Sequence, residues 1–489
     1  MKKIVLPLAS VALVVLLSLG ISGSMPTGAQ ALAAKPNIVF ILADDMRKDD
    51  LTYMSHTRFL LAEKGMSFEN AFVSNGLCCP ARATIMRGQY AHNTGVWLNG
   101  GPDEGGWHAY RSNGNEQDNV ATRLDAAGYR TGLFGKYLNG YSNTTVIPPG
   151  WDRWFATFHP PWEYFDYDVN DDGTIRHFGT RASDYQTDVL KRETRTFIGA
   201  SVRQGKPFFA YVAPLAPHGP FISAPRDRHT YDGLKAPRPL SFNEEDISDK
   251  PPWIRQLPRL SEAEEARIDD KQEKRAETLQ ALDDLVAGVV GKLRDKDVMD
   301  NTYVFFTSDN GVHRGEHRIP GGKGRPYEED VRVPLLVHGP GVAVGHKAHN
   351  LALNTDYLPT FTDLACTSSI PCNTQNWTYV PDGRSLRPVL QGNATTWRST
   401  ILLEAHRMNA GSTPSYYGVR TSDNKYLEYE GGKRELYFLG HDPYELKNKY
   451  PAAKPSARLV FRLQALRTCA GVGCRAAENG QWVIQHGGR

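Results

Sequence analysis

The amino-acid sequence predicts an α/β fold: a doubly wound, mostly parallel sheet with helices on both faces, followed by a small C-terminal α+β subdomain with an antiparallel sheet. Three observations support this prediction. Several short runs are apolar on both faces, as buried parallel strands are. Helical segments lie between these runs, which is the order found in a sheet covered on both sides. After about residue 400, short strands separated by glycine turns replace this pattern.

The first 33 residues are expected to be a secretory signal peptide. Two lysines follow the initial methionine, residues 4–21 are apolar apart from two serines, a glycine and Pro7, and small-residue cleavage sites follow at 29–31 and 31–33. A retained membrane anchor is the alternative, because the apolar run is nearly long enough to span a bilayer. Pro7 and the two Ala-x-Ala sites favour cleavage, so we expect a secreted or extracytoplasmic protein with no stable membrane span.

The overall composition is that of a globular protein and excludes two classes. Hydrophobic residues make up 40% and charged residues 23% of the 489 residues, which argues against a disordered or fibrous chain. Lys plus Arg number 57 against 54 Asp plus Glu, a formal net charge of +3. A dedicated nucleic-acid-binding protein would normally show a basic excess, so we expect no nucleic-acid partner.

The predicted strands of the main sheet each lead into residues that can carry chemistry. In doubly wound sheets, ligands bind beyond the carboxyl ends of the strands. The side chains that follow these runs are therefore expected to meet at one site. Residues 38–43 precede Asp44 and Asp45, residues 129–134 precede Lys136, residues 208–212 precede His218, and residues 302–307 precede Asp309 and Asn310.

One helix has a clear start signal. Ser261 and Glu264 have the spacing of a capping box, and apolar residues follow at helical spacing from Leu279 to Leu293, before the strand at 302–307. Residues 235–260 contain five prolines and are expected to form a long surface excursion.

The C-terminal part is expected to contain short strands at 416–420 and 435–438 and a helix near 456–467. We therefore divide the chain into a signal peptide at 1–33, a main α/β domain at 34–400 and a C-terminal antiparallel subdomain at 401–489.

Export makes the six cysteines informative, because exported proteins keep disulfides. Cys366 and Cys372 lie six residues apart and Cys469 and Cys474 lie five apart, so each pair can close a short local disulfide. Spacing alone does not fix the connectivity, but these are the economical pairings. Cys78 and Cys79 are adjacent and cannot easily pair with each other.

The segment from Cys78 to Arg82 reads Cys-Cys-Pro-Ala-Arg. Alone it also fits an ordinary cysteine before a turn proline. The pattern Cys-x-Pro-x-Arg resembles the signature of type I sulfatases. In that family a dedicated formylglycine-generating enzyme oxidises the first cysteine to formylglycine (3-oxoalanine), whose hydrated aldehyde is the nucleophile. The resemblance assigns this role to Cys78, because counting from Cys79 would place Ala81 where proline belongs.

Further stretches extend the resemblance over nearly all of the chain after residue 33. The resemblance is closest to N-acetylglucosamine-6-sulfatases and the extracellular heparan 6-O-endosulfatases, and it implies an alkaline-phosphatase-like fold. The matching stretches include residues 135–139, 148–151, 184–185, 216–220, 308–311, 322–328, 332–335, 435–437 and 442–443.

Asp44, Asp45, Asp309 and Asn310 offer only oxygen ligands, which suit hard cations. Ca²⁺ is favoured, with Mg²⁺ as the alternative. An Asp-Asp pair can also be a loop or a helix N-cap, but two such clusters at two strand ends favour a metal site. The resemblance implies that the metal holds a sulfate oxygen and the modified Cys78.

Basic residues near these strand ends are candidates for the remaining catalytic roles. Lys136 and Lys323 can clamp sulfate oxygens and offset charge in the transition state, although a lone lysine is usually a solvated surface residue. The resemblance implies that Arg82 braces the modified residue and the metal ligands. His218, framed by two prolines, can protonate the leaving alcohol, or it is a histidine packed into a proline turn.

One departure from the family pattern affects the base. Many arylsulfatases carry a histidine two residues after the first lysine, where this chain has Leu138. His313, close behind Asp309 and Asn310, is the substitute candidate for deprotonating the formylglycine hydrate. Other side chains are candidates for lining the pocket or binding a sugar ring, although each also fits a structural role: His177, His317, Tyr164, Tyr167 and Trp253.

The leading functional interpretation is hydrolysis of sulfate monoesters, with a sulfated carbohydrate such as 6-sulfated N-acetylglucosamine, or an aryl sulfate, as substrate. The alternatives within the same superfamily are a general arylsulfatase and a phosphomonoester or phosphonate-ester hydrolase. An alternative of another class is an inactive protein that binds sulfated glycans and whose Cys78 is never modified.

Overall fold

The computed structural model describes Met1 and residues 35–101, 103–158, 163–366, 371–372, 374–375, 377–409 and 412–481. Apart from Met1, the predicted signal peptide lies outside these residues. The chain from residue 34 onward forms one unit. Within the described residues, no helix combines the length and the apolar composition needed to cross a bilayer.

A ten-stranded sheet is the centre of this unit. The five strands in its middle, β9, β1, β8, β4 and β5, are parallel to one another, whereas β10 and β6 run antiparallel to the strands beside them. The doubly wound, mostly parallel sheet is thus confirmed. In sheet order the strands are β11 (His346–Ala348), β2 (Met66–Phe68), β10 (Leu335–His338), β9 (Thr302–Ser308), β1 (Asn37–Ala43), β8 (Phe208–Ala213), β4 (Arg130–Lys136), β5 (Arg153–Thr157), β6 (Tyr167–Asp171) and β7 (Thr174–Phe178).

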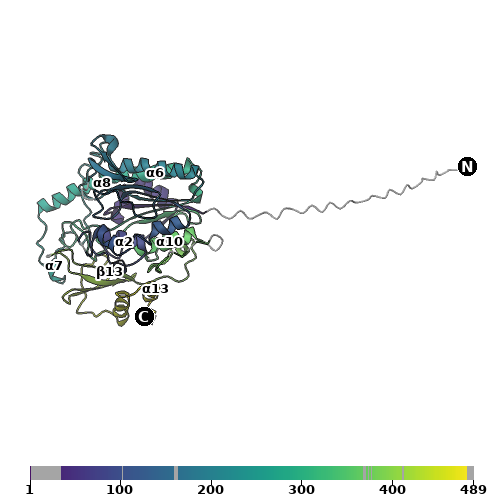
Figure 1. The fold of residues 1–489 in the computed structure, drawn as a ribbon. Coiled ribbons are helices and arrows are strands. Elements are labelled where there is room, and N and C mark those ends of the chain that lie inside the picture. Colours follow the sequence, from purple (N-terminus) through teal and green to yellow (C-terminus); the bar gives the residue numbers. More distant parts are fainter. Residues whose placement is uncertain are drawn as a thin grey trace. The chain divides into compact units, whose positions relative to one another are not determined.

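Helices cover both faces of this sheet, with α6 and α8 on one side and α2 and α10 on the other (Figure 1). Strand β1 is apolar throughout because both of its faces are buried. Val39 and Ile41 belong to the core under α6 and α8, whereas Ile38, Phe40 and Leu42 belong to the core over α2, α5 and α10. Complete burial of such a side chain stabilises a fold by about 1.5–3 kcal/mol. The longer helices are α2 (Cys78–Arg87), α4 (Gly106–Ser112), α5 (Val120–Ala126), α6 (Gln186–Arg203), α8 (Glu262–Arg294) and α10 (Tyr357–Ala365).

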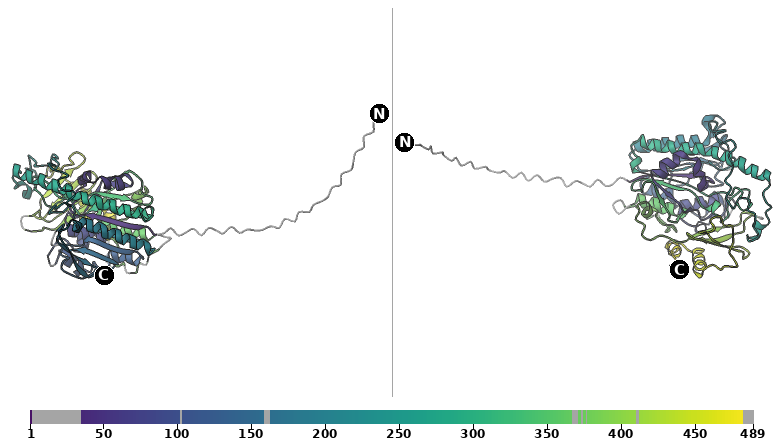
Figure 2. Two further views of the ribbon diagram at one scale, coloured as in Figure 1. Left: turned by 90° about the horizontal axis from the view of Figure 1, so that it is seen from above. Right: turned by 180° about the vertical axis from the view of Figure 1, so that it is seen from behind.

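The long helix α8 begins where the sequence predicts. Ser261 is its N-cap and accepts a hydrogen bond from the Glu264 backbone N–H, while the Glu264 carboxylate accepts one from the Ser261 N–H. The helix packs beside α6 (Figure 2, left) and leads into β9. The proline-rich residues 235–260 contain the single turn α7 (Pro252–Arg255). The remaining short helices are α1 (Ser55–Thr57), α3 (Ala91–Thr94), α9 (Glu328–Val331) and α11 (Arg387–Leu390).

The C-terminal part contains a four-stranded antiparallel sheet and two helices, on the side of the large sheet opposite α6 and α8 (Figure 2, right). The predicted short strands and the helix near 456–467 are confirmed. The predicted boundary at 400/401 stays a prediction. The elements are β13 (Ile401–Ala405), β14 (Tyr416–Arg420), β15 (Asn424–Tyr429), β16 (Arg434–Phe438), α12 (Ala457–Leu466) and α13 (Val472–Glu478), and a separate two-stranded sheet joins β3 (Ala71–Phe72) and β12 (Ala352–Leu353).

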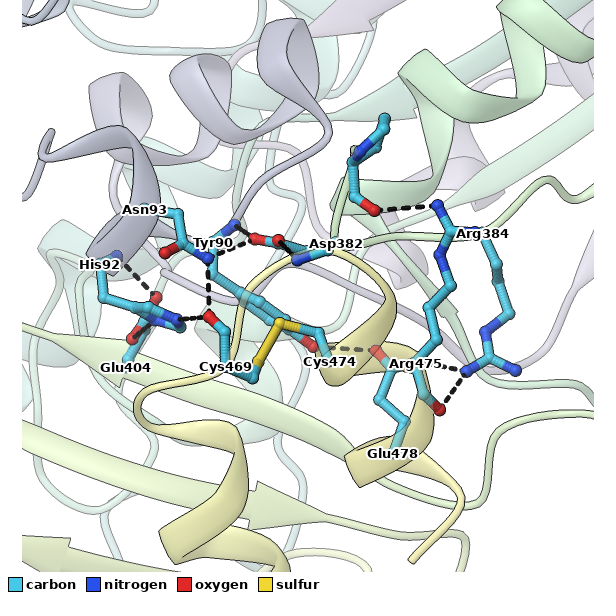
Figure 3. Close-up of a disulfide and its surroundings, with 12 residues drawn as sticks. Tyr90, His92, Asn93, Asp382, Arg384, Glu404, Cys469, Cys474, Arg475 and Glu478 are labelled. Atoms are coloured by element: carbon cyan, nitrogen blue, oxygen red, sulfur yellow. Dashed lines mark hydrogen bonds and ion pairs between the residues drawn. A yellow bond between two sulfur atoms is a disulfide. The ribbon is translucent and has the colours of Figure 1, made fainter. Parts of the chain in front are cut away.

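Both predicted disulfides, Cys366–Cys372 and Cys469–Cys474, are present. The second closes a loop that packs against the segment following α2 (Figure 3). The Cys469 carbonyl accepts a hydrogen bond from Asn93 Nδ2 (2.9 Å) and lies 2.9 Å from His92 Nε2. The C-terminal part therefore packs against α3, the short helix that follows α2.

Candidate active site

Cys78 is the first residue of α2 and is fully buried. Its Sγ lies 3.5 Å from Asp44 Oδ1, 3.8 Å from Asp45 Oδ1 and 2.6 Å from Lys323 Nζ. A helix N-terminus carries partial positive charge from its unpaired backbone N–H groups. The cysteine thus lies between a helix N-terminus, a lysine and two carboxylates.

The two acidic pairs meet because their strands are neighbours in register. Ala43 of β1 pairs with Ser308 of β9, so the residues that follow leave the sheet at the same level. The Asp45 N–H donates to Asp309 Oδ1 (3.1 Å), and Asn310 Nδ2 donates to Asp45 Oδ1 (2.6 Å).

Two lysines and an arginine neutralise this cluster. Lys136 Nζ lies 2.5 Å from Asp44 Oδ2 and both side chains are fully buried, while Lys323 Nζ contacts Asp45 Oδ1. Arg82 Nε lies 2.8 Å from Asp309 Oδ2, and Arg82 Nη1 donates to the Lys136 carbonyl (3.2 Å). Arg82 therefore links the Asp309 carboxylate to the end of strand β4.

A glycine allows β4 to deliver Lys136 at this position. Gly135 has a φ of +107°, which side chains rarely adopt, and a Cβ there would lie 2.1 Å from the Ala213 carbonyl oxygen of the neighbouring strand β8. Any other residue would push β4 and β8 apart and move the Lys136 amine.

Burial and neighbouring charges shift the pKa values of the site in different directions. Burial opposes ionisation of Asp44, but the charges of Lys136, His218, Arg82 and Lys323 hold its pKa well below the usual range. Burial instead prevails at Cys78 and raises the pKa of its thiol well above the usual range. Burial lowers the pKa of Lys323, but the negative charges of Asp45, Cys78, Asp44 and Asp309 together outweigh burial and raise this pKa well above its ordinary value.

The donor groups fit a hard divalent cation. Ligand atoms of Asp44, Asp45, Cys78 and His218 all lie within 4.8 Å of one another. Asn310 Oδ1 is buried and has no hydrogen-bond partner, as expected of an oxygen held for a metal ion.

His218 follows β8 and is partly exposed at the edge of this cluster. Its Nε2 lies 3.6 Å from Asp45 Oδ2, its Nδ1 lies 2.6 Å from the Gly219 carbonyl oxygen, and its own carbonyl accepts a hydrogen bond from the Tyr164 hydroxyl (2.7 Å). The backbone and one ring nitrogen are thus held, while Nε2 faces the acidic pair.

The interpretation of Tyr164 and Tyr167 as sugar-binding faces is wrong. Both rings are buried in the core between the sheet and α6, so neither has a face open to a ligand. Trp253 packs against Tyr327 and Tyr429. Aromatic side chains serve cores and sugar sites equally well, and the sequence does not separate these uses.

The other candidate histidines have structural partners. His177 is exposed on the edge strand β7 and pairs with Asp168 and Asp166, and buried His317 lies 2.6 Å from Glu244 Oε2 through its Nδ1. Neither pairing involves a residue of the acidic cluster.

His313 lies beside the site, with its contacts directed to Asp330 and not to Cys78. Its Nδ1 lies 2.7 Å from Asp330 Oδ1, and its buried Nε2 has no hydrogen-bond partner. His313 and Asp45 line the same small cavity of about 100 Å³, together with Arg275. The role of His313 as the base stays a prediction.

Sequence reasoning missed Arg275 on α8. Its Nη2 contacts the Asp45 carbonyl, its Nη1 donates to the Pro217 carbonyl (3.1 Å), and the guanidinium pairs with buried Asp50 (2.8 Å). Arg275 therefore joins the loops after β1 and β8. The available signal was its position at helical spacing before Leu279 and Leu282, on the apolar face of the helix.

Comparison with known proteins shows the family of this chain and agrees with its fold. The family described as Sulfatase matches residues 36–367, and the family described as N-sulphoglucosamine sulphohydrolase, C-terminal, matches residues 315–467. The chain belongs to the sulfatase family. It is a sulfuric ester hydrolase similar to the N-acetylglucosamine-6-sulfatases, as the curated relatives show.

The N-acetylglucosamine-6-sulfatase of Homo sapiens is 32% identical over 519 residues, covering 96% of this chain and 91% of that protein. The extracellular sulfatase SULF-1 homolog of Drosophila melanogaster is 34% identical over 382 residues, which are 76% of this chain and 33% of that protein. These identities extend beyond the Cys78 segment to most of the chain.

Two solved structures share the fold at lower identity. A protein determined in complex with its substrate D-glucosamine-2-N,6-O-disulfate has a TM-score of 0.75 and 22% identity, with 91% of this chain and 99% of that chain covered. The phosphonate monoester hydrolase of Agrobacterium radiobacter has a TM-score of 0.69 and 21% identity, with 91% and 96% covered. At these identities the likeness concerns the fold.

Proposed function

We propose that the chain hydrolyses the 6-O-sulfate ester of N-acetylglucosamine units in sulfated carbohydrate, using formylglycine formed from Cys78 and a divalent cation. The observation that carries this proposal is the position of Cys78 Sγ, 2.6 Å from Lys323 Nζ and 3.5 Å from Asp44 Oδ1 at the N-terminus of α2. A nucleophile at this point is surrounded by groups that bind an oxyanion and its counter-ion.

The residues that would hold the cation are Asp44, Asp45, Asp309, Asn310 and residue 78. Oxygen donors favour Ca²⁺, with Mg²⁺ as the alternative. When bound, the cation supplies positive charge to the sulfate oxygens, and the modified residue supplies a hydrated aldehyde as nucleophile.

The other side chains either bind the sulfate group and position the site or transfer protons. Lys136 and Lys323 hold sulfate oxygens from two sides of residue 78, and Arg82 keeps Asp309 and the end of β4 in place. His218 donates a proton from Nε2 to the leaving alcohol, because its Nδ1 is already engaged by the Gly219 carbonyl. His313, oriented by Asp330, is the candidate for taking a proton from the nucleophile.

The substrate assignment rests on relatives that cover the chain. Three N-acetylglucosamine-6-sulfatases are each 32% identical over at least 87% of it. Arylsulfatases of Volvox carteri and Chlamydomonas reinhardtii are 31% identical over more than 90% of it, so a general arylsulfatase is the competing function.

Maturation and export complete the proposal. The chain needs a formylglycine-generating enzyme as a partner before it acts, and residues 1–33 direct it out of the cytoplasm. The main α/β domain is assigned to residues 34–400 and the supporting subdomain to 401–489.

The test uses protein co-expressed with a formylglycine-generating enzyme, with conversion of residue 78 measured by mass spectrometry. The kcat/KM values are compared for 6-sulfated N-acetylglucosamine, an aryl sulfate and an aryl phosphate. We expect the sugar sulfate to be preferred. Efficient cleavage of the aryl sulfate with no release from the sugar would make the chain a general arylsulfatase. Fastest cleavage of the phosphate would make it a phosphomonoester hydrolase. An unmodified Cys78 without turnover, in a protein that still binds sulfated glycans, would make it an inactive glycan-binding protein.

A further inference from the structure

We propose that Arg275 is a positioning residue of the active site, which fixes the Asp45 carboxylate for the divalent cation and holds His218 beside it. The roles of Asp45 and His218 rest on the proposed function, whereas the contacts of Arg275 are geometric. Arg275 is a buried residue of α8 that lies 230 residues after Asp45 in the chain.

Arg275 contacts two loops at the edge of the sheet at equivalent points. The loops after β1 and β8 meet where the Asp44 N–H donates to the Ala216 carbonyl (3.3 Å). The next carbonyl of each loop accepts a hydrogen bond from the same guanidinium, that of Asp45 from Nη2 and that of Pro217 from Nη1 (3.1 Å). A guanidinium is planar and holds its N–H groups in a fixed fork, so one rigid group sets the spacing of these two carbonyls.

Asp45 depends on such a contact because its backbone conformation is unusual. Its φ is +63°, in the left-handed region that residues other than glycine rarely adopt and that surrounding contacts must hold. The Asp45 N–H donates to Asp309 Oδ1 (3.1 Å) and its carbonyl accepts from Arg275, so the backbone is held on both sides of the Cα. The Asp45 carboxylate is thereby kept at the nucleophile, with Oδ1 3.8 Å from Cys78 Sγ.

A buried carboxylate fixes the guanidinium itself. Asp50 Oδ2 accepts hydrogen bonds from Arg275 Nε (3.2 Å) and Nη2 (2.8 Å), so each guanidinium nitrogen of Arg275 has a partner. Asp50 Oδ1 accepts from Arg314 Nη1 (2.8 Å), and the Arg47 N–H donates to Oδ2 (3.0 Å). Because Asp50 is fully buried, moving Arg275 away from the loops would also take a cation from this carboxylate, which is costly.

The contact with the Pro217 carbonyl also places the next residue, His218. The Tyr164 hydroxyl donates to the His218 carbonyl (2.7 Å), so two consecutive carbonyls of this loop are held, one by Arg275 and one by Tyr164. His218 Nε2 lies 3.6 Å from Asp45 Oδ2. The imidazole assigned to protonate the leaving alcohol is therefore kept beside Asp45 through Arg275.

A role as a charge alone predicts the opposite of a role in positioning. Arg275 is a cation beside a cation site, so removal of its charge by itself should strengthen the binding of Ca²⁺. Release of Asp45 should instead weaken binding, because a ligand that is no longer oriented must be ordered when the cation binds. The sign of the change in affinity separates the two roles.

The first experiment measures the Kd of Ca²⁺ by isothermal titration calorimetry after chelator treatment, with the state of residue 78 matched in all variants by mass spectrometry. Arg275→Lys keeps the charge but cannot reach both carbonyls, and Arg275→Met removes both charge and donors. Both should bind Ca²⁺ about tenfold to a hundredfold more weakly than the native chain, the usual effect of losing a group that orients a metal ligand. Asp50→Asn, which leaves Arg275 in place but loosens it, should change the Kd in the same direction.

Arg123→Lys is the matched control for loss of stability alone. Arg123 is buried like Arg275, pairs with Asp118 (2.6 Å) and donates to the Tyr379 carbonyl (3.0 Å), and none of these partners belongs to the active site. This variant should be less stable in chemical denaturation and should keep its Kd for Ca²⁺. Unchanged or tighter Ca²⁺ binding in the folded Arg275 variants, or an equal weakening in Arg123→Lys, would overturn the inference.

The second experiment concerns His218 and uses the modified enzyme at saturating Ca²⁺. The alcohol released from a 6-sulfated sugar needs a proton, whereas 4-nitrophenyl sulfate releases a stable anion. Arg275→Lys should therefore lower kcat more for the sugar sulfate than for 4-nitrophenyl sulfate. An equal loss on both substrates would overturn the placement of His218 by Arg275.

Two outcomes distinguish failure of this inference from failure of the proposed function. Weaker Ca²⁺ binding in the Arg275 variants of a chain that hydrolyses no sulfate ester would remove the proposed function and leave the positioning of Asp45 standing. A native chain that binds neither Ca²⁺ nor Mg²⁺ would overturn the inference, whether or not it hydrolyses sulfate esters.

Discussion

Lys425 Nζ donates a hydrogen bond to the Pro326 carbonyl (2.9 Å), three residues after Lys323. Lys425 belongs to β15 in the C-terminal sheet, whereas Lys323 contacts Cys78 and Asp45. The C-terminal sheet therefore holds the loop that brings a positive charge to the nucleophile.

Replacement of Lys425 tests this support. Its side chain is fully buried and pairs with Glu328 Oε1 (3.0 Å) and Glu445 Oε1 (2.8 Å), so Lys425→Met removes the cation beside buried Glu445 and one of the cations beside Glu328, which keeps Arg420. We expect a loss of about 3–5 kcal/mol in the free energy of unfolding, the usual cost of breaking a buried pair. Chemical denaturation measures it, with exposed Lys433→Ala as the control. A loss below about 1 kcal/mol would show that these carboxylates do not depend on Lys425.

Replacement of the two adjacent cysteines separates their roles. Cys78→Ala should lower kcat by about a thousandfold or more, because the nucleophile is removed. Cys79→Ala should keep most of the activity and lose about 1 kcal/mol of stability, because Cys79 packs in the core over α2 and does not contact the acidic cluster. Steady-state kinetics and thermal unfolding of both variants check this. An inactive Cys79→Ala with an active Cys78→Ala would reverse the assignment.

Removal of the divalent cation should stop hydrolysis. Treatment with a strong chelator and the variant Asp309→Asn should each lower kcat/KM by at least about a hundredfold, since the lysines alone cannot offset the charge around the sulfate. Elemental analysis should show metal lost in both cases, while Asp232→Asn, an exposed carboxylate in another loop, should retain metal and activity. Full activity in metal-free protein would disprove the assigned ligands.

The contact between His92 and Glu404 should make stability depend on pH. Burial alone lowers the pKa of His92, but the Glu404 carboxylate, 2.8 Å from Nδ1, outweighs it and raises the pKa to about 9 (Figure 3). The Cys469 carbonyl and Asp382 act in the same direction. Because the folded pKa lies above the unfolded value, the charged histidine stabilises the fold fully below about pH 6.5, and this contribution is lost as pH rises toward 9.

The measurement compares the free energy of unfolding of the native chain and of His92→Gln between pH 5 and pH 10. The difference should be on the order of 2–3 kcal/mol near pH 6 and should shrink progressively toward pH 9 and above. A difference that stays constant over this range would show that His92 does not bind an additional proton in the folded state.

The sequence by itself determined the main sheet and the place of the acidic cluster. Strands buried on both faces must be apolar at every position, as β1 is, so they are visible without alternation. Because parallel strands end at one edge, Asp44 and Asp309 were expected to meet, and the register of Ala43 with Ser308 brings them level. The capping box of Ser261 and Glu264 is local and needs no knowledge of the fold.

Only the tertiary structure decided which charged and aromatic side chains are buried, and against what. Arg275 pairs with Asp50 across 225 residues, and Lys425 reaches Pro326 across 99. A sequence shows that such a residue is charged, but the energy of its burial depends on partners that the fold supplies. The same holds for Tyr164, whose ring lies in the core while its hydroxyl donates a hydrogen bond to the His218 carbonyl. Continuous apolar runs and the polar residues after them therefore predicted the strands and their ends, whereas burial of polar groups depended on contacts distant in sequence.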